Sequence, residues 1–211
     1  GTAKFTYSLK TQEHGAANTE FGGGIITINI TSVANGLELE GLKAIGNEYT
    51  NGNNEFIALS TDTGGIGLSS MIDKDGSETI QTILLDGIPA GFLVYYGEDG
   101  HQKLAQNAGS NDNINNTWSI PVESNGTAPQ IWVKAPENWS GDVSGITLKT
   151  IVKDGETIST ITKDFTLNVS PVASSVTISP TTTFANAYNW TEINLNANMT
   201  DLDGSETLSI E

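Results

Sequence analysis

The feature that most limits the fold of this chain is a short alternation of apolar and polar residues that recurs along its length. In runs such as GIITINIT (24–31) and ITLKTIV (146–152) most alternate positions carry an apolar side chain, and clusters of Gly, Asn, Asp and Pro separate the runs. Period two is the repeat of a β-strand. The sequence therefore predicts an all-β protein built of stacked sandwiches. The stretch 101–108 is the one place where we expect a short helical turn.

Two pairs of segments repeat each other along the chain. ITINITSVANGLEL (26–39) matches FTLNVSPVASSVTI (165–178), and MIDKDGSETI (71–80) returns as MTDLDGSETL (199–208). A repeat of this length indicates a tandem array of modules, each about one domain in size.

The repeat predicts where the modules begin and end. We expect one complete β-sandwich module over residues 35–173, the closing strands of a preceding module over 1–34, and the opening strands of the next over 174–211. The short segments SVAN and PVAS are the expected linkers. An alternative boundary in the polar stretch 107–116 would divide the chain into two halves of similar length.

The charge balance excludes several classes of partner. The 211 residues include 25 Asp and Glu but only nine basic residues, all Lys, which gives a formal net charge of −16. Such a surface repels nucleic acid and anionic lipid, and it suits a cation-binding protein. There is no Cys, so neither disulfides nor thiol chemistry are possible. No segment is apolar for long enough to cross a bilayer, and we expect no membrane insertion.

The repeated acidic loop, D-x-D-G-S-E-T, has the spacing of a cation site. Asp73 and Asp75 stand two residues apart and can point the same way, while Gly76 allows a turn that returns Glu78 towards them. Carboxylates crowded together in this way repel one another unless a cation lies among them. Oxygen ligands in a flexible loop suit Ca²⁺, although D-x-D-G is also a common solvated turn. The predicted ligands from the two copies are Asp73, Asp75, Glu78, Asp201, Asp203 and Glu206.

The loop differs from the familiar calcium motifs. It lacks the Gly at position 6 and the Glu at position 12 of an EF-hand, and the chain lacks the glycine-rich nonapeptide of calcium-binding β-rolls. Asp62, Asp142 and Asp112 are further carboxylates that we rank lower, because turns and strand ends often carry such residues.

Four motifs in fixed order resemble a known family. They are D-x-D-G-S-E-T (73–79), I-P-A-G (88–91), W-S-G-D (139–142) and the strand at 165–172. Over most of residues 35–211 the chain resembles the tandem repeat modules of very large bacterial adhesins exported by type I secretion, the RTX adhesins. The resemblance implies Ig-like or cadherin-like β-sandwich modules in tandem, stabilised by Ca²⁺ between neighbouring modules.

By the same resemblance, the protein would lie outside the cell, at the bacterial surface, and would act as an extender that projects ligand-binding regions. Its partners would be neighbouring modules of the same chain and, through the parent protein, a host or surface glycan or peptide. The insertion TDTGGIGL (61–68) and the unmatched start (1–24) depart from the family pattern, and they leave room for a specialised module.

Other functions have less support in the sequence. His14 and His101 are the only histidines, both in polar segments, and there is no G-x-S-x-G motif, so we expect no enzyme. A second hypothesis is an adhesin module that binds sugar or peptide through exposed aromatic side chains and Ca²⁺, since Tyr95 and Tyr96 are neighbours in a strand and must face opposite ways. We expect the four tryptophans, Trp118, Trp132, Trp139 and Trp190, to fill the sandwich cores.

Overall fold

The computed structural model describes residues 1–15, 17, 20–50, 55–62, 64–66, 76–110, 115–124, 126–179, 183–193, 195–199, 201 and 203–209. Across these residues the regular structure consists of β-strands alone, which confirms the all-β prediction. The same residues contain no helix long and apolar enough to span a membrane.

Strands account for most of the described residues. They are β1 (Thr2–Thr11), β2 (Glu20–Asn29), β3 (Lys43–Asn47), β4 (Ile57–Thr61), β5 (Gly64–Gly65), β6 (Glu78–Pro89), β7 (Leu93–Gly97), β8 (Lys103–Leu104), β9 (Gln106–Ser110), β10 (Asn115–Ile120), β11 (Gln130–Lys134), β12 (Gly141–Asp154), β13 (Thr157–Ser170), β14 (Val176–Ile178) and β15 (Ala197–Met199).

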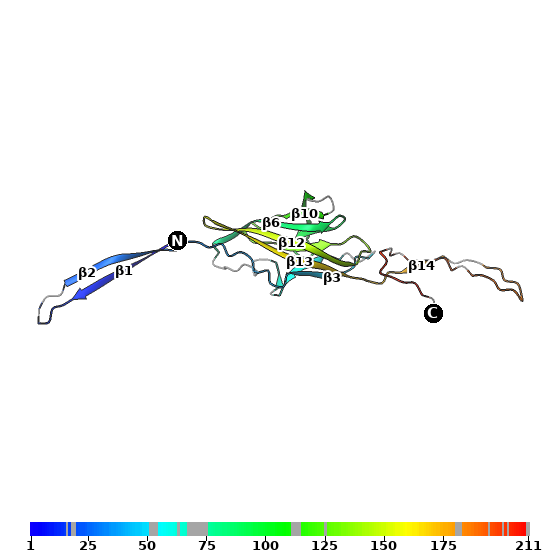
Figure 1. Cartoon of the computed structure of the whole chain (residues 1–211), viewed down its shortest axis with the longest axis horizontal. Helices are drawn as coiled ribbons and strands as arrows, with labels where there is room; N and C mark the ends of the chain where they lie inside the picture. Colours follow the sequence, from blue (N-terminus) through cyan, green and yellow to red (C-terminus); the bar gives the residue numbers. More distant parts are fainter. Residues whose placement is uncertain are drawn as a thin grey trace.

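A central sandwich contains strands β3 to β13. Its strands form one hydrogen-bonded path in the order β8-β7-β11-β4-β3-β13-β12-β6-β10-β9, with β5 pairing with β4. The described pairings are antiparallel except for β3 and β13, which run parallel from Ala44 opposite Leu167 to Asn47 opposite Ser170. The path folds over on itself into a sandwich that is close to a closed barrel (Figure 1).

The core of the sandwich follows from the period-two pattern. Along β12 the buried side chains alternate from Ile146 through Leu148 and Thr150 to Val152, and the facing strands contribute residues such as Val94. One continuous hydrophobic cluster includes residues from both sides of the stretch 107–116. Strands β9 and β10, which overlap the two ends of this stretch, pair with each other. The alternative boundary at 107–116 would therefore divide a single core.

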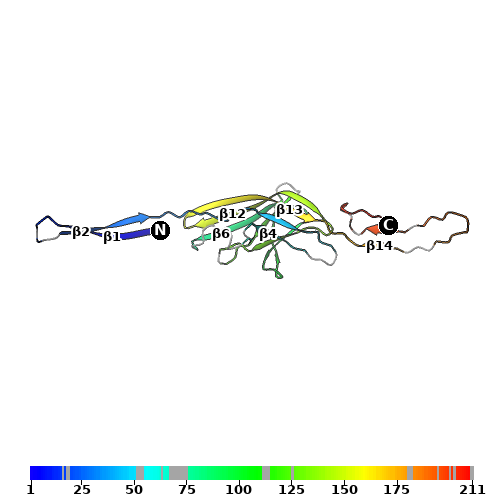
Figure 2. The ribbon, with the colours of Figure 1, turned by 90° about the horizontal axis from the view of Figure 1, so that it is seen from below.

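Two thin extensions project from opposite ends of the sandwich (Figures 1 and 2). The hairpin of β1 and β2 leaves one end, and the segment with the short pair β14 and β15 leaves the other. Phe5 and Ile26 are opposite each other on one face of the hairpin and are 54% and 51% exposed. The extensions thus contain sequences that match strands of the sandwich. Their described side chains, however, are not part of its hydrophobic core.

Two detailed expectations are wrong. The stretch 101–108 contains strand residues of β8 and β9 instead of a helical turn. Trp118 and Trp132 are buried and Trp139 packs against the core, but Trp190 is fully exposed. Trp190 lies in the C-terminal extension, where the described residues offer no second sheet to cover it.

Candidate metal centre

A cluster of acidic residues lies where the sandwich meets its C-terminal extension. Because β3 and β13 run parallel, their carboxyl ends meet at the same edge of the sheet. The Glu48 amide, just after β3, donates to the Ser170 carbonyl and extends this ladder by one bond of 2.8 Å. The Glu48 side chain then accepts a hydrogen bond of 3.0 Å from the Val172 amide, in the segment that leaves β13. This hydrogen bond holds the Glu48 side chain against the segment in which the chain leaves β13.

The second copy of the acidic loop supplies the other two carboxylates. Asp201 Oδ1 accepts the Asp203 amide at 2.9 Å, and Asp203 Oδ1 accepts the Ser205 amide at 2.7 Å. Asp203 Oδ2 accepts both the amide and the hydroxyl of Ser140, at 3.0 and 2.8 Å. Ser140 immediately precedes β12 of the sandwich, so Asp203 ties the extension back to it.

Glu48, Asp201 and Asp203 form one cluster. One oxygen from each carboxylate lies within 4.8 Å of the other two. Glu48 and Asp201 are almost completely buried, at 0% and 2% exposure, while Asp203 lies at the exposed rim. The sandwich and the extension thus contribute carboxylate oxygens to one acidic cluster that is largely buried.

No Lys among the described residues forms an ion pair with the carboxylates of the cluster. Burial raises the pKa of Glu48, the Val172 amide opposes this, and nearby Asp201 adds to the rise. At the rim, hydrogen bonds from the side chain and amide of Ser205 and from Ser140 lower the pKa of Asp203 to about 2. Within the part of the chain that the structure describes, Glu48 Oε1 and Asp201 Oδ2 are buried and have no hydrogen-bond partner. Buried charged groups in proteins are normally paired or bound to metal, so this cluster could hold a metal ion.

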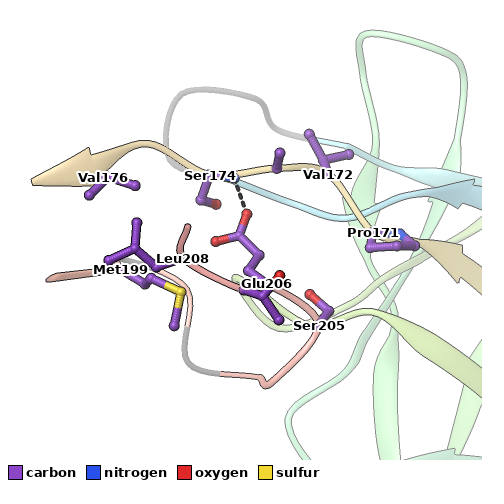
Figure 3. A pocket seen from close by; sticks show the side chains of 10 residues that line it. Pro171, Val172, Ser174, Val176, Met199, Ser205, Glu206 and Leu208 are labelled. Atoms are coloured by element: carbon purple, nitrogen blue, oxygen red, sulfur yellow. Dashed lines mark hydrogen bonds between the residues drawn. The ribbon is translucent and has the colours of Figure 1, made fainter. Parts of the chain in front are cut away.

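The linker beside the cluster has its own carboxylate contact. Glu206 Oε1 accepts a short hydrogen bond from the Ser174 amide, as the dashed line in Figure 3 shows. The two residues line a pocket with Val172, Met199 and Leu208 at the start of the extension. Glu206 therefore orders the linker next to the cluster and is outside the group of three.

Of the three remaining predicted ligands, the structure describes only Glu78. Glu78 is buried at the opposite end of the sandwich, and Asp73 and Asp75 fall outside the described residues. Of the lower-ranked carboxylates, Asp62 forms an ion pair with Lys43 at 3.7 Å and Asp142 accepts a short hydrogen bond from Asn168. Asp112 is also outside the described residues.

Glu48 is the site residue that the sequence did not predict. It has no place in the D-x-D-G-S-E-T motif, and it reaches the site only because β3 pairs with a strand about 120 positions later in the chain. Its local signal is weak: a charged residue directly after a short strand is ordinarily a solvated turn residue.

A scan against models of protein families and a search of curated proteins found no match to this chain. The site must therefore be interpreted from its own chemistry.

Proposed function

We propose that this chain is a Ca²⁺-dependent structural segment of a large bacterial cell-surface adhesin of the RTX type, made of Ig-like or cadherin-like modules in tandem. In this proposal Ca²⁺ binds at the junction between the central sandwich and the C-terminal extension. There it fixes the angle between consecutive modules, so that the array projects a distant ligand-binding region from the cell.

The observation that carries the proposal is the origin of the three carboxylates. Glu48 belongs to the sandwich, whereas Asp201 and Asp203 belong to the next copy of the repeat. A cation held by all three would join the two units and remove the repulsion between them. The motif resemblance adds that such modules occur in tandem outside the cell, and the absence of Cys leaves metal as an alternative to disulfides for stiffening the array.

The donor set favours Ca²⁺ over other metals. All three candidate ligands are carboxylates, which are hard oxygen donors, whereas Zn²⁺ sites normally include His or Cys. Ca²⁺ accepts six to eight oxygens in flexible geometry, and water and backbone carbonyls can complete such a shell. Mg²⁺ demands near-ideal octahedral geometry, which a junction between two units is less suited to supply.

The expected stabilisation is large for a chain without disulfides. Extracellular calcium modules bind with dissociation constants of about 0.1–1 mM. At a free Ca²⁺ concentration of about 10 mM, one such site would add about 1.4–2.7 kcal/mol.

The first test is thermal unfolding across a Ca²⁺ titration, with Mg²⁺ and EGTA as references, for the wild type and Glu48→Gln. We expect a Ca²⁺-selective rise in melting temperature that Glu48→Gln largely removes. Glu98→Gln, which changes an exposed carboxylate, is the matched control and should respond as the wild type does. An equal rise in all three proteins would contradict the proposed site.

The second test measures rigidity directly. Because the chain has no Cys, spin labels can be placed at Glu98→Cys in the sandwich and Ser179→Cys in the extension, both exposed positions. We expect a narrow distribution of label distances in Ca²⁺ and a broad one in EGTA, and a broad one in both conditions when Glu48→Gln is added. Equal widths with and without Ca²⁺ would overturn the mechanical role.

A further inference from the structure

The linker between the β1–β2 hairpin and the sandwich contains a chemically labile pair of residues. The sequence has three Asn-Gly pairs, namely Asn35–Gly36, Asn51–Gly52 and Asn125–Gly126. In such a pair the Gly amide nitrogen can attack the side-chain amide of Asn, because Gly has no side chain to obstruct the approach. In the first pair Asn35 is exposed and Gly36 is buried. This pair therefore lies where solvent meets the edge of the sandwich.

The fold requires glycine at position 36. Gly36 has a φ of +84°, a conformation that residues with a side chain rarely adopt. A Cβ atom at this position would also lie 1.6 Å from Ile161 Cδ1, on β13. A larger residue, which would slow the attack on Asn35, therefore cannot replace Gly36 without disturbing the sandwich. Any protection of the pair has to come from its surroundings.

Glu78 accepts hydrogen bonds from both amides of this pair. Glu78 Oε1 accepts a short hydrogen bond from the Asn35 amide and a longer one, of 3.4 Å, from the Gly36 amide. Glu78 is the first residue of β6 and is 5% exposed, so the acceptor belongs to the sandwich. Consecutive amides that converge on one oxygen are a common way to hold an anion. The Gly36 N–H group is thus directed at a buried carboxylate.

The reaction that this contact opposes is the deamidation of Asn35. The Gly36 nitrogen bonds to Asn35 Cγ, and its proton leaves with the side-chain NH₂ group as ammonia, so that a succinimide ring forms. Water then opens the ring at either carbonyl and gives aspartate or isoaspartate, which carries one more carbon in the backbone. Loss of the Gly36 amide proton beside Glu78 Oε1 would place two negative charges together, and burial makes that costly.

The product of this reaction would disturb the junction. Asn35 lines a cavity of about 350 Å³ together with Asp154. Asp154 is opposite Glu78 in the register of β12 and β6, and it is 7% exposed. Deamidation would add a further carboxylate, at position 35, to this end of the sandwich. The extra backbone carbon of isoaspartate would also shift the Gly36 amide away from Glu78 Oε1.

We propose that Asn35 is a deamidation site and that Glu78 protects it while the N-terminal junction is closed. The reaction then proceeds only in molecules in which the linker has separated from Glu78, and hydrolysis of the succinimide makes each such event irreversible. The extent of modification therefore records how often the junction has opened. The site needs no metal and is independent of the proposed function.

The first test compares Glu78→Ala with Glu206→Ala, in EGTA at mildly alkaline pH. Glu206 accepts the Ser174 amide in the same way, but Ser174 and Ser175 stand in place of the Asn-Gly pair. Glu78→Ala should speed the deamidation of Asn35 about tenfold, because hydrogen bonds to a charged group are lost. Glu206→Ala should leave the rate as it is in the wild type. An unchanged or slower rate in Glu78→Ala would overturn the proposal.

Peptide mass spectrometry follows the three Asn-Gly pairs separately. In urea all three should react at similar rates, because only the local sequence then influences them. In the folded wild type, Asn35 should react about tenfold more slowly than in urea, or more slowly still. Equal rates at Asn35 in the two conditions would mean that the fold gives no protection, which contradicts the proposal.

Hydrogen exchange keeps the proposal testable if Glu78→Ala does not fold. In the wild type, amide exchange at Gly36 and deamidation of Asn35 both require release of the same N–H group from Glu78. The fold should therefore slow the two reactions by factors that agree within about threefold. Strong protection from exchange together with rapid deamidation would show that Glu78 does not control the site.

Asn35→Ser, which copies the residue of the second repeat, tests the consequence for the junction. After long incubation in EGTA, the wild type should show faster amide exchange at the start of β6 than before, whereas Asn35→Ser should not change. The two proteins differ only at position 35, so reactions at the other Asn-Gly pairs cancel. An equal change in both proteins would contradict the proposed effect on the junction.

Discussion

The central sandwich and its N-terminal hairpin contain matching sequence in two different surroundings. Ile26 and Ile28 of β2 occupy the repeat positions of Phe165 and Leu167 of β13. The first two are 51% and 47% exposed, and the second two are 6% and 0% exposed. The alternation makes a strand in both places, but among the described residues β13 has strands opposite it that form a core, whereas β2 has none. Burial is thus a property of the partners of a strand, and not of the strand alone.

In contrast to burial, one local hydrogen bond is the same at the N-terminal and the C-terminal junction of the sandwich. Glu78 accepts a hydrogen bond from the Asn35 amide, and Glu206 accepts one from the Ser174 amide. These four residues occupy matching positions in the repeat. The same glutamate therefore orders the same point of each linker, whether or not a complete module follows.

The comparison predicts that the hairpin would become part of a core if its missing partners were supplied. A chain in which a copy of residues 35–139 precedes Gly1 would combine strands equivalent to β3–β11 with β1 and β2. We expect a second cooperative unfolding unit, with a stability in the usual range of about 5–15 kcal/mol. Hydrogen exchange should show new protection of the β1 and β2 amides, and unchanged exchange there would break the comparison.

Single substitutions should show the same contrast at smaller scale. Leu167→Ala removes a completely buried side chain and should cost about 2–5 kcal/mol. Ile28→Ala, at the matching position of the exposed hairpin, should change the free energy of unfolding by less than about 0.5 kcal/mol. Urea unfolding of both variants measures the difference, and equal losses would mean that the hairpin is covered in solution.

The linker contacts should have local effects. Glu206→Ala removes the acceptor of the Ser174 amide, a net loss of about 1 kcal/mol, so that amide should exchange roughly fivefold faster. The unfolding of the sandwich should hardly change, because Glu206 lies outside its core. A large drop in the melting temperature of the whole chain would show instead that the extension and the sandwich unfold together.

The smallest expected effect is the acid response of Asp203. Its pKa in the folded protein is about 2, below the ordinary 3.8, so this carboxylate stabilises the fold above pH 3.8. The contribution is lost as pH falls from 3.8 through about 2, and exposure to solvent keeps it small. In metal-free buffer, Asp203→Asn should therefore be slightly less stable than the wild type at pH 5 and equal to it below pH 2.

Several features could be predicted because they depend on local pattern. The strand alternation predicts an all-β chain, and the loop motif correctly indicates Asp201 and Asp203 as members of an acidic cluster. The same motif places Glu206 beside that cluster, on the linker. In each case the determining residues are near each other in the sequence, so spacing alone contains the information.

The partners of those residues were decided by the tertiary structure. Glu48 joins the C-terminal cluster because β3 and β13 run parallel, and Asp154 faces Glu78 because β12 pairs with β6 in one register out of many. Trp190 is exposed because no described sheet covers it, although the sequence around it has the pattern of a strand. Strand pairing joins residues far apart in the chain, and period two by itself specifies neither the partner of a strand nor its register.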